Sequence, residues 1–162
     1  MIGLWDKFHA EETHPYGNPD TYRLAADWLN GFGLIEDWGC GRGYFKQFVK
    51  GDYFGIDGSG TFAGVRANLA SRKSQAPCIL LRHVLEHNIE WRKILVNLLD
   101  SFTCRAVIVS FIPLQEKEHI LGWENGIPNI ALPREEFMQM ILPYLSEMRI
   151  EGDEVLYYLV QP

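Results

Sequence analysis

Short apolar runs alternate with amphipathic segments along most of the chain, and this alternation predicts a sheet whose strands are connected by helices. Continuous apolar runs bounded by glycine, proline or charged residues are typical of strands that are buried on both faces. Such runs predict strands at residues 33–38, 52–57, 78–82 and 105–112, and a further short strand is expected at residues 65–69.

Helical periodicity marks the segments between these strands. In residues 18–31, Asn18 is a good cap, Pro19 suits the first helical position and Gly31 suits the end. In residues 89–102, apolar residues recur at spacings of three and four, which places them on one core-facing stripe. Further helices are expected at residues 43–51, which would be brief, and at residues 133–145, which begin near Pro133 and are interrupted near Pro143.

The C-terminal tail predicts a β-hairpin, since residues 147–152 and 154–161 have strand patterning and are joined through Gly152 and Asp153. Strands that alternate with helices and end in a hairpin indicate an α/β fold. We expect a mostly parallel sheet with an antiparallel C-terminal hairpin strand and helices on both faces. A chain of 162 residues predicts one domain, residues 1–162, with an N-terminal cap helix at about 19–30 and a core at about 33–162.

The composition is that of an ordinary globular protein, with 47% apolar and 22% charged residues. A net charge of −6 argues against a broad basic surface that would bind nucleic-acid phosphates. No apolar run is long enough to span a membrane, and the first residues lack the basic and apolar parts of a secretion signal. Cys40, Cys78 and Cys104 are scattered without a C-x-x-C pair, which favours buried thiols in a reducing compartment. We therefore expect a cytoplasmic protein without membrane contact.

A glycine-rich segment, Asp-Trp-Gly-Cys-Gly-Arg-Gly at residues 37–43, follows the first predicted strand. Glycines allow positive φ angles and let a ligand approach the backbone closely. The segment lacks the Gly-Lys-Ser/Thr of a P-loop and the last glycine of a dinucleotide-binding turn. Asp37 beside the loop would repel a pyrophosphate, and it favours a cationic ligand such as an ammonium or a sulfonium.

A second carboxylate stands at the tip of the next predicted strand. Asp57 ends the segment YFGID and is followed by Gly58. At this place in an α/β sheet a carboxylate can accept hydrogen bonds from both hydroxyls of a ribose. A cation site beside a ribose site indicates a sulfonium nucleoside as the ligand.

The ordered segments LIEDWGCGRG, YFGIDGS, ILLRHVLEHN and AVIVSFIPL resemble the motif series of class I S-adenosylmethionine-dependent methyltransferases. The resemblance covers about residues 33–113, half of the chain, and implies a Rossmann-like sheet with S-adenosyl-L-methionine as the cofactor. Only about 20 residues separate Asp57 from the fourth strand, so the sheet is expected to be shortened between strands two and four.

The resemblance also implies a cofactor site. The methionine part would lie against Gly39, Gly41 and Gly43, with Asp37 helping to hold its ammonium, and Asp57 would bind the ribose. The acid that such families place against the adenine amino group corresponds to Asn68, whose side-chain oxygen can still accept that hydrogen bond. The remaining residues of the expected cofactor site are Gly58, Leu69 and Arg82.

Candidate catalytic groups follow the fourth strand, in the segment Arg82-His83-Val84-Leu85-Glu86-His87. Methyl transfer from a sulfonium is an in-line displacement, so the protein aligns the reactants and supplies a base only where the acceptor must lose a proton. We predict His83 and His87 as the catalytic residues. For His87 the alternative is a structural role, in which it only hydrogen-bonds the scaffold.

The same segment suggests two metal hypotheses. His83-x-x-Glu86-His87 matches the H-x-x-E-H pattern of some zinc peptidases, but that motif needs a long helix and His83 follows an apolar strand. Some O-methyltransferase families carry E-x-x-E-H here and bind a divalent ion, and that parallel would make His83, Glu86, His87 and His119 the ligands. Because His83 replaces the first Glu, the parallel is weak and no metal site is predicted.

The segments that would choose the methyl acceptor are weakly patterned. Residues 5–18 and 113–133 fall in this class, and we expect the longer one to be a binding loop or lid. Four aromatic residues could line a substrate pocket or pack in the core: Tyr16, Tyr22, Phe111 and Trp123.

The sequence thus predicts an enzyme that methylates an oxygen or nitrogen of a small polar metabolite or a glycan. No N/D-P-P-Y/F segment and no Pro-Cys pair follows the fourth strand, which argues against methylation of exocyclic base amines and of pyrimidine C5. Two alternatives stay open. One is a nucleic-acid methyltransferase, for example one acting on an RNA ribose 2′-oxygen, and the other is a non-catalytic cofactor-binding subunit.

Overall fold

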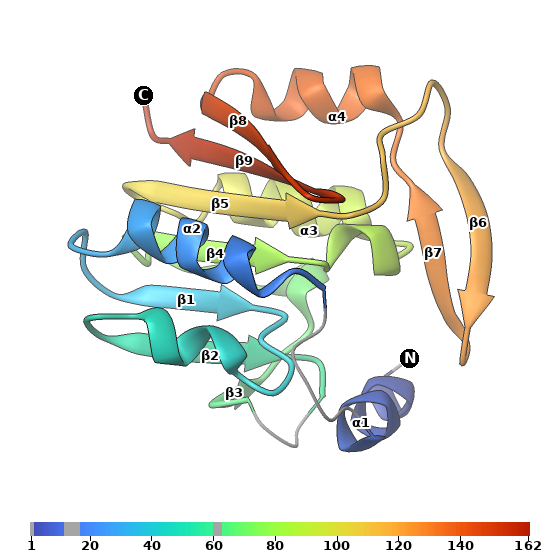
Figure 1. Ribbon diagram of the computed structural model, residues 1–162, viewed down its shortest axis with the longest axis horizontal. Coiled ribbons are helices and arrows are strands. Elements are labelled where there is room, and N and C mark those ends of the chain that lie inside the picture. The colour runs from blue at the N-terminus through green and yellow to red at the C-terminus, as the bar shows by residue number, and fades with distance from the viewer. Residues whose placement is uncertain (1, 12–16, 60–62) are drawn as a thin grey trace.

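The computed structural model describes residues 2–11, 17–59 and 63–162, and a seven-stranded sheet forms its centre (Figure 1). The strand order is β3-β2-β1-β4-β5-β9-β8. The strands are β1 (Ile35–Trp38), β2 (Tyr53–Asp57), β3 (Val65–Arg66), β4 (Cys78–Arg82), β5 (Arg105–Ser110), β8 (Leu145–Glu151) and β9 (Glu154–Val160).

Strands β1 to β5 are parallel to one another, and β9 runs antiparallel between β5 and β8. The predicted parallel α/β sheet with an antiparallel C-terminal hairpin is therefore confirmed. The chain builds outward from β1 in both directions, so the strand order reverses between β1 and β4. In open α/β sheets the carboxyl ends of the strands at such a point form the ligand-binding crevice.

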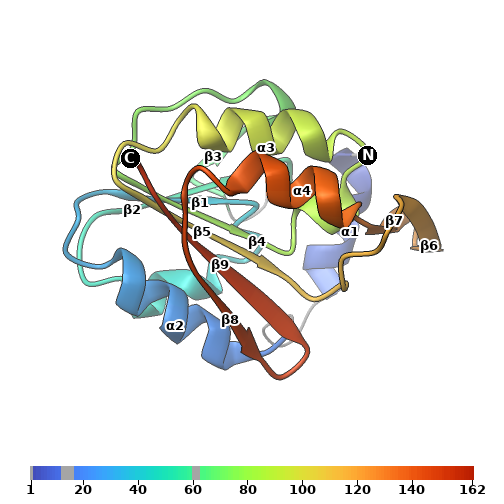
Figure 2. The same ribbon diagram turned by 90° about the horizontal axis from the view of Figure 1, so that it is seen from above.

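Helices cover both faces of the sheet, as predicted. Helix α2 (Pro19–Leu29) lies on one face, whereas α3 (Trp91–Leu99) and α4 (Arg134–Ile141) lie on the other (Figure 2). Each face has its own apolar core, with Ala25 and Leu29 on the α2 side and Trp91 and Phe137 on the opposite side. Within the described residues, no helix is long and apolar enough to cross a membrane.

The start of α2 follows from its sequence. The Asn18 side chain accepts a hydrogen bond from the backbone N–H of Asp20 at 3.0 Å, and Pro19 occupies the first turn. Gly31, just beyond the helix, has a φ of 90°, a conformation that glycine adopts without strain. Helix α3 is shorter than the predicted span of 89–102, and Phe102 is buried beyond its end.

Two predicted elements are smaller in the structure. Residues Tyr44–Phe48 form a 3₁₀ turn, η1, in place of the brief helix expected at 43–51. Strand β3 holds only Val65 and Arg66, because the side chain of Asn68 caps a 3₁₀ turn, η2 (Leu69–Ser71), by accepting from Ala70 N. Strand β3 begins eight residues after β2 ends, so the expected shortening between strands two and four is present.

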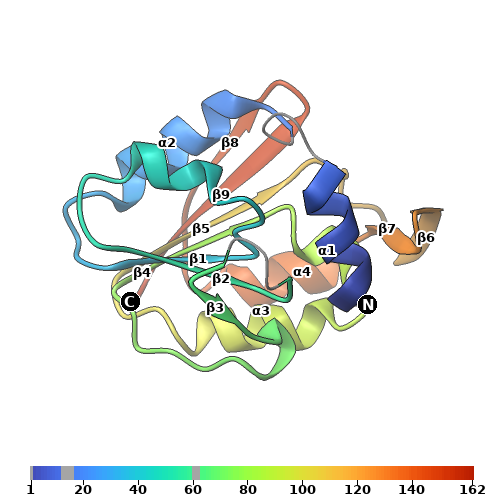
Figure 3. The same ribbon diagram turned by 90° about the horizontal axis from the view of Figure 1, so that it is seen from below.

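Three elements were not predicted, and they are α1 (Ile2–Glu11), β6 (His119–Glu124) and β7 (Ile127–Ala131). Strands β6 and β7 form an antiparallel hairpin within the stretch expected to be a loop. Its turn is Asn125-Gly126, with φ angles of 50° and 82°, and this dipeptide is a strong hairpin signal. Helix α1 and the hairpin both lie at the carboxyl edge of the parallel strands (Figures 1 and 3).

Candidate functional site

A cavity of about 210 Å³ opens at the carboxyl ends of β1, β2 and β4, next to the point where the strand order reverses. The glycine loop and Asp57 form one wall of it. Helix α1 contributes Trp5 and His9, and the β6–β7 hairpin contributes Glu124. Residues 5–18 and 113–133, for which the sequence predicted no regular structure, therefore contribute walls to the same cavity as the glycine loop and Asp57.

The glycine loop is held tightly to β2. The backbone N–H groups of Gly39 and Cys40 donate to Ile56 O at 2.7 and 3.2 Å. Gly39, Gly41 and Gly43 all have positive φ, at 81°, 50° and 73°. A Cβ on Gly39 would lie 2.3 Å from Val84 Cγ2, so a side chain there has no room. Gly39 and Gly41 line the cavity, whereas Gly43 lies outside its lining and caps η1.

Asp57 pins the loop at the end of β2. One carboxylate oxygen accepts from Gly41 N at 2.9 Å, and the other accepts from Ser59 N at 2.7 Å. The side chain is buried and lines the cavity. Each oxygen of a carboxylate has two lone pairs, so both oxygens can still accept a hydrogen bond from a ligand hydroxyl.

Asp37 lies behind the loop and does not line the cavity. Its carboxylate accepts a hydrogen bond from the Tyr53 hydroxyl at 2.8 Å. Burial raises the pKa of Asp37 to about 7, and the nearby Asp57 adds to this rise, while the Tyr53 hydrogen bond and Arg82 act against it. A cation close to this carboxyl group would favour its ionised form.

Gly58, Asn68 and Leu69 line the cavity together, as expected for one side of a nucleoside pocket. The side-chain oxygen of Asn68 already caps η2, so a ligand donor would have to share that oxygen. The Leu69 side chain is buried, and its carbonyl oxygen accepts from Asn97 Nδ2 at 3.0 Å, which ties this wall to α3.

Arg82, at the end of β4, is held by partners from two other elements of the fold. Arg82 Nη2 lies 3.0 Å from Glu154 Oε1, and Arg82 Nε donates to Thr21 Oγ1 at 3.1 Å. The guanidinium also lies over the ring of Tyr22, with Cζ 4.0 Å from the ring centroid. Arg82 borders the cavity while joining β4, α2 and β9.

His83 follows in an unusual backbone conformation, with a φ of 53°. Its Nε2 lies 3.3 Å from Glu154 Oε2, and its ring packs edge-on against Phe111. Burial lowers the pKa of His83, although the hydrogen bond to Glu154 opposes that shift. Non-glycine residues in this region of φ cost energy and often lie at functional sites. His83 also lines the cavity.

His87 is the second predicted catalytic residue on the cavity wall. Its Nδ1 lies 3.0 Å from Pro128 O on β7, and because a carbonyl oxygen only accepts, Nδ1 carries the proton. The ring of Trp5 meets the His87 ring edge-on, with centroids 5.8 Å apart. Burial lowers the pKa of His87, and the Pro128 bond and the charge of Glu124 oppose the shift.

The structure does not assemble the hypothetical metal ligands. Glu86 is fully buried and accepts from Phe111 N at 3.2 Å, and burial raises its pKa. His119 is exposed at the start of β6. Across the described residues, no group of three or more His, Cys, Asp or Glu side chains is placed to hold an ion. The set His83, Glu86, His87 and His119 is therefore not brought together.

Of the four aromatic residues singled out in the sequence, Tyr22 lines the cavity. Phe111 packs between the rings of His83 and His87. Trp123 is 58% exposed and lies outside the cavity lining, so a pocket role for it is not supported. Tyr16 falls outside the described residues.

The cysteines carry no disulfide, and all three are free. Only Cys78 is fully buried, while Cys40 and Cys104 are partly accessible, so the expectation of three buried thiols holds for one of them. Cys40 lines the cavity within the glycine loop.

Among the lining residues that sequence reasoning missed are Trp5, His9 and Glu124, and it also missed Glu154, which holds Arg82 and His83 from outside the cavity. The turn Asn125-Gly126 could have revealed the hairpin and hence Glu124. Glu154 lies 72 residues from Arg82 along the chain, and no local pattern reports such a pair. Trp5 and His9, four residues apart on α1, have stacked rings with centroids 5.7 Å apart.

Comparison with known proteins gives a match in structure alone. No family model and no curated protein sequence matches the chain. Among solved structures, magnesium protoporphyrin IX methyltransferase from Synechocystis PCC 6803, with bound SAH, aligns with a TM-score of 0.70 at 14% identity, over 99% of this chain and 94% of that one. The 1,6-didemethyltoxoflavin-N1-methyltransferase of Burkholderia thailandensis, with bound 1,6-didemethyltoxoflavin and S-adenosylhomocysteine, aligns with a TM-score of 0.70 at 11% identity, over 88% and 77%.

A third match is a chain of the Haloferax volcanii complex between the Trm112 methyltransferase activator and a methyltransferase. It has a TM-score of 0.73 at 12% identity and covers 98% of this chain and 97% of that one. These similarities agree with the strand order, the antiparallel β9 and the position of the cavity. The chain has the fold of the class I S-adenosylmethionine-dependent methyltransferases.

Proposed function

We propose that the protein transfers a methyl group from S-adenosyl-L-methionine to an oxygen or nitrogen of a small polar molecule. The observation that carries the proposal is the cavity at the strand-order reversal, which places the Asp57-pinned glycine loop and His87 on walls of one space. A nucleoside-binding wall and a proton acceptor in one cavity are the two parts that such a reaction needs.

The residues of the first wall fit the cofactor. Asp57 is buried, borders the cavity and has acceptor capacity left on both oxygens, which suits the two hydroxyls of a ribose. Gly58, Asn68 and Leu69 would lie along the base, and Gly39 and Gly41 along the methionine part. Asp37 would act from behind the loop, where its charge favours the ammonium group.

Arg82 and His83 act in this proposal by positioning. Glu154 holds the side chains of both residues, so the end of β4 is fixed where it borders the cavity. Val84 then packs on Gly39 and keeps the glycine loop in place. His83 is thus assigned to the support of the site, and His87 is assigned to the chemistry.

His87 would accept the proton that the acceptor atom loses as it gains the methyl group. Its Nδ1 proton is committed to Pro128 O, so Nε2 is the basic nitrogen. Because burial lowers the pKa of His87, its ring is neutral at neutral pH, which is the form that can accept a proton. The sulfonium of the bound cofactor supplies the methyl group.

The test is a transfer assay with methyl-labelled S-adenosylmethionine and a panel of small oxygen and nitrogen acceptors. We expect labelled product with the wild type and a loss of about 10²–10⁴-fold with His87→Ala, the usual contribution of a general base. His119→Ala, which changes an exposed histidine outside the cavity, should retain full activity. Cofactor binding without transfer to any acceptor would instead support a non-catalytic cofactor-binding subunit.

A gel-shift titration with RNA at low and physiological salt addresses the nucleic-acid alternative. The net charge of −6 leads us to expect no salt-sensitive RNA binding. Binding that weakens steeply with salt would favour an RNA substrate over a small molecule.

A further inference from the structure

Three carboxylates border the cavity, those of Asp57, Glu90 and Glu124, and they differ in their hydrogen-bond and ion-pair partners. Asp57 accepts hydrogen bonds from two backbone N–H groups. Glu90 is paired with Lys93 Nζ at 2.6 Å. Glu124 borders the same cavity, and within the described part of the chain no hydrogen bond or ion pair engages its carboxylate. A charged group left in this state on a cavity wall is available to a ligand.

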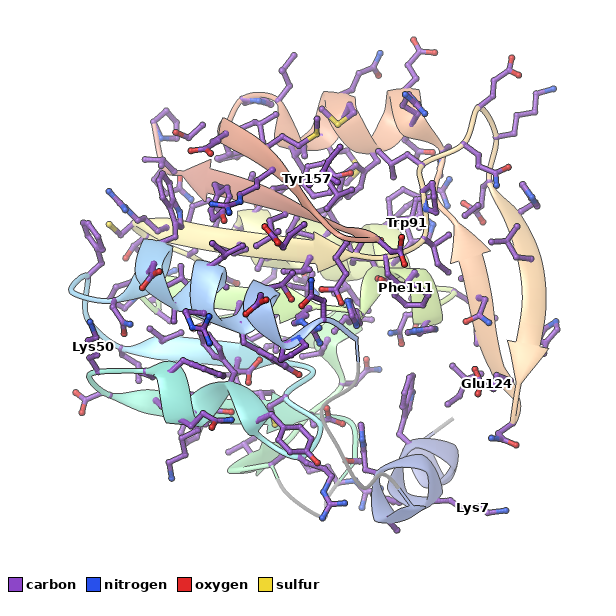
Figure 4. The ribbon with its side chains drawn as sticks, viewed as in Figure 1. Lys7, Lys50, Trp91, Phe111, Glu124 and Tyr157 are labelled. Atoms are coloured by element: carbon purple, nitrogen blue, oxygen red, sulfur yellow. The ribbon has the colours of Figure 1, made fainter. Side chains whose placement is uncertain are left out.

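The fold fixes the position of Glu124. It is the last residue of β6 and pairs with Ile127 across the Asn125-Gly126 turn. Both turn residues have positive φ, which is the geometry of the tight hairpin turn that matches the twist of the strands. Figure 4 shows Glu124 near the tip of the hairpin, on the side that faces helix α1.

The groups around Glu124 belong to the acceptor side of the cavity. The negative charge of Glu124 raises the pKa of His87, the proposed base, although burial lowers that pKa by more. The Trp5 ring stands edge-on to the same histidine. Asn129 and Ile127, on β7, complete this part of the lining. An aromatic ring, an apolar side chain and a carboxylate therefore surround the place where the acceptor would bind.

We propose that Glu124 binds a protonated amine of the acceptor, so that the substrates are cationic amines with an apolar body. This inference rests on the proposed methyltransferase function. The ammonium at Glu124 is distinct from the methylated atom, because a protonated nitrogen has no lone pair with which to attack. Glu124 would offset the repulsion between that ammonium and the sulfonium of the cofactor.

The same charge disfavours acidic substrates. A carboxylate or phosphate bound beside His87 would meet the negative charge of Glu124, which is not ion-paired to any described cation. Like charges at close range are a common means of rejecting a competing ligand. Glu124 is therefore a specificity-determining residue, and His87 remains the catalytic one.

The test uses two probes of nearly equal shape and opposite charge, phenethylamine and 3-phenylpropionate. Each is titrated by calorimetry into protein that has first been saturated with S-adenosylhomocysteine. We expect the amine to bind about tenfold more tightly than the carboxylate, a modest factor because solvent reaches Glu124. In Glu124→Gln the preference should fall to about one, since the amide keeps the shape of the side chain and loses its charge.

Glu116→Gln is the matched control, because it removes the same charge from an exposed position outside the cavity. It should keep the preference for the amine. The inference is overturned if the carboxylate binds as well as the amine, if neither probe binds at millimolar concentration, or if Glu124→Gln keeps the preference. Failure to bind S-adenosylhomocysteine in the first step would instead overturn the proposed function, so the two failures are distinguishable.

Discussion

Three buried carboxyl groups lie at or beside the site, those of Asp37, Asp57 and Glu154, and each has different hydrogen-bond partners. Asp57 accepts hydrogen bonds from two backbone N–H groups, whereas Asp37 accepts one from the Tyr53 hydroxyl. Glu154 pairs with Arg82, and although burial alone would raise its pKa, the hydrogen bond from His83 and the charge of Arg82 lower it to about 2. Burial outweighs the partners of Asp37, whereas the partners of Glu154 outweigh its burial.

Asp37 gives a pH-dependent test at this scale. The pKa of Asp37 is about 7 in the native state and 3.8 ordinarily. Between pH 3.8 and pH 7 the native state therefore holds a proton that the unfolded state has lost. Asp37 therefore contributes full stability below pH 3.8 and loses it as the pH rises to 7. Replacement by Asn should stabilise the protein relative to the wild type increasingly over this range, by up to roughly 4 kcal/mol.

Chemical denaturation of the wild type and Asp37→Asn at several pH values measures this difference in the free energy of unfolding. Asp52→Asn, at an exposed position, should give no trend over the same range. A difference for Asp37→Asn that does not change between pH 4 and pH 7 would contradict the assigned native pKa.

At the scale of elements, the β6–β7 hairpin and α1 turn an open sheet edge into a closed cavity. The hairpin reaches the site through Pro128 O, which contacts His87, and through Glu124, Ile127 and Asn129 on the cavity wall. Helix α1 is tied to the edge strand β3 by an ion pair between Asp6 and Arg66 at 3.3 Å. The hairpin would therefore shape the acceptor side, whereas α1 also lies against the glycine loop, because a Cβ on Gly41 would stand 2.8 Å from the His9 ring.

The hairpin turn offers a test at this scale. Gly126 has a φ of 82°, which an L side chain adopts only with strain, so Gly126→Ala should cost about 1–2 kcal/mol in the free energy of unfolding. Gly122→Ala is the control, because Gly122 lies in β6 without a positive φ and an added Cβ meets nothing within 4 Å. Equal effects of the two substitutions would contradict the strained-turn assignment.

The sequence predicts the long elements because their periodicity is local. The apolar stripe of α3 and the runs of β4 and β5 are visible in windows of a few residues. The sequence overestimates the length of β3, because the polar cap Asn68 ends that strand after two residues. It fails for β6, which is exposed along most of its length and so lacks the alternation that marks a half-buried strand.

At the scale of the whole molecule, the fold follows from the order of the motifs, but the assembly of the site does not. The glycine loop and Asp57 are close in sequence, and their meeting at one sheet edge was predictable from parallel topology. The Arg82–Glu154 pair joins β4 to the C-terminal hairpin and α2, and only the folded chain brings these segments together. The acceptor side depends on such distant contacts, so the sequence left it open.

Calorimetry tests most directly whether this cavity binds S-adenosylmethionine through Asp57. Calorimetric titration with S-adenosylhomocysteine should give one-site binding to the wild type, and Asp57→Ala should lose about 2–4 kcal/mol through two hydrogen bonds to the ribose. Asp100→Ala, which removes an exposed carboxylate paired with Lys73, should bind normally, and thermal unfolding of each variant controls for folding. No heat with the wild type, or equal binding by Asp57→Ala, would contradict the account.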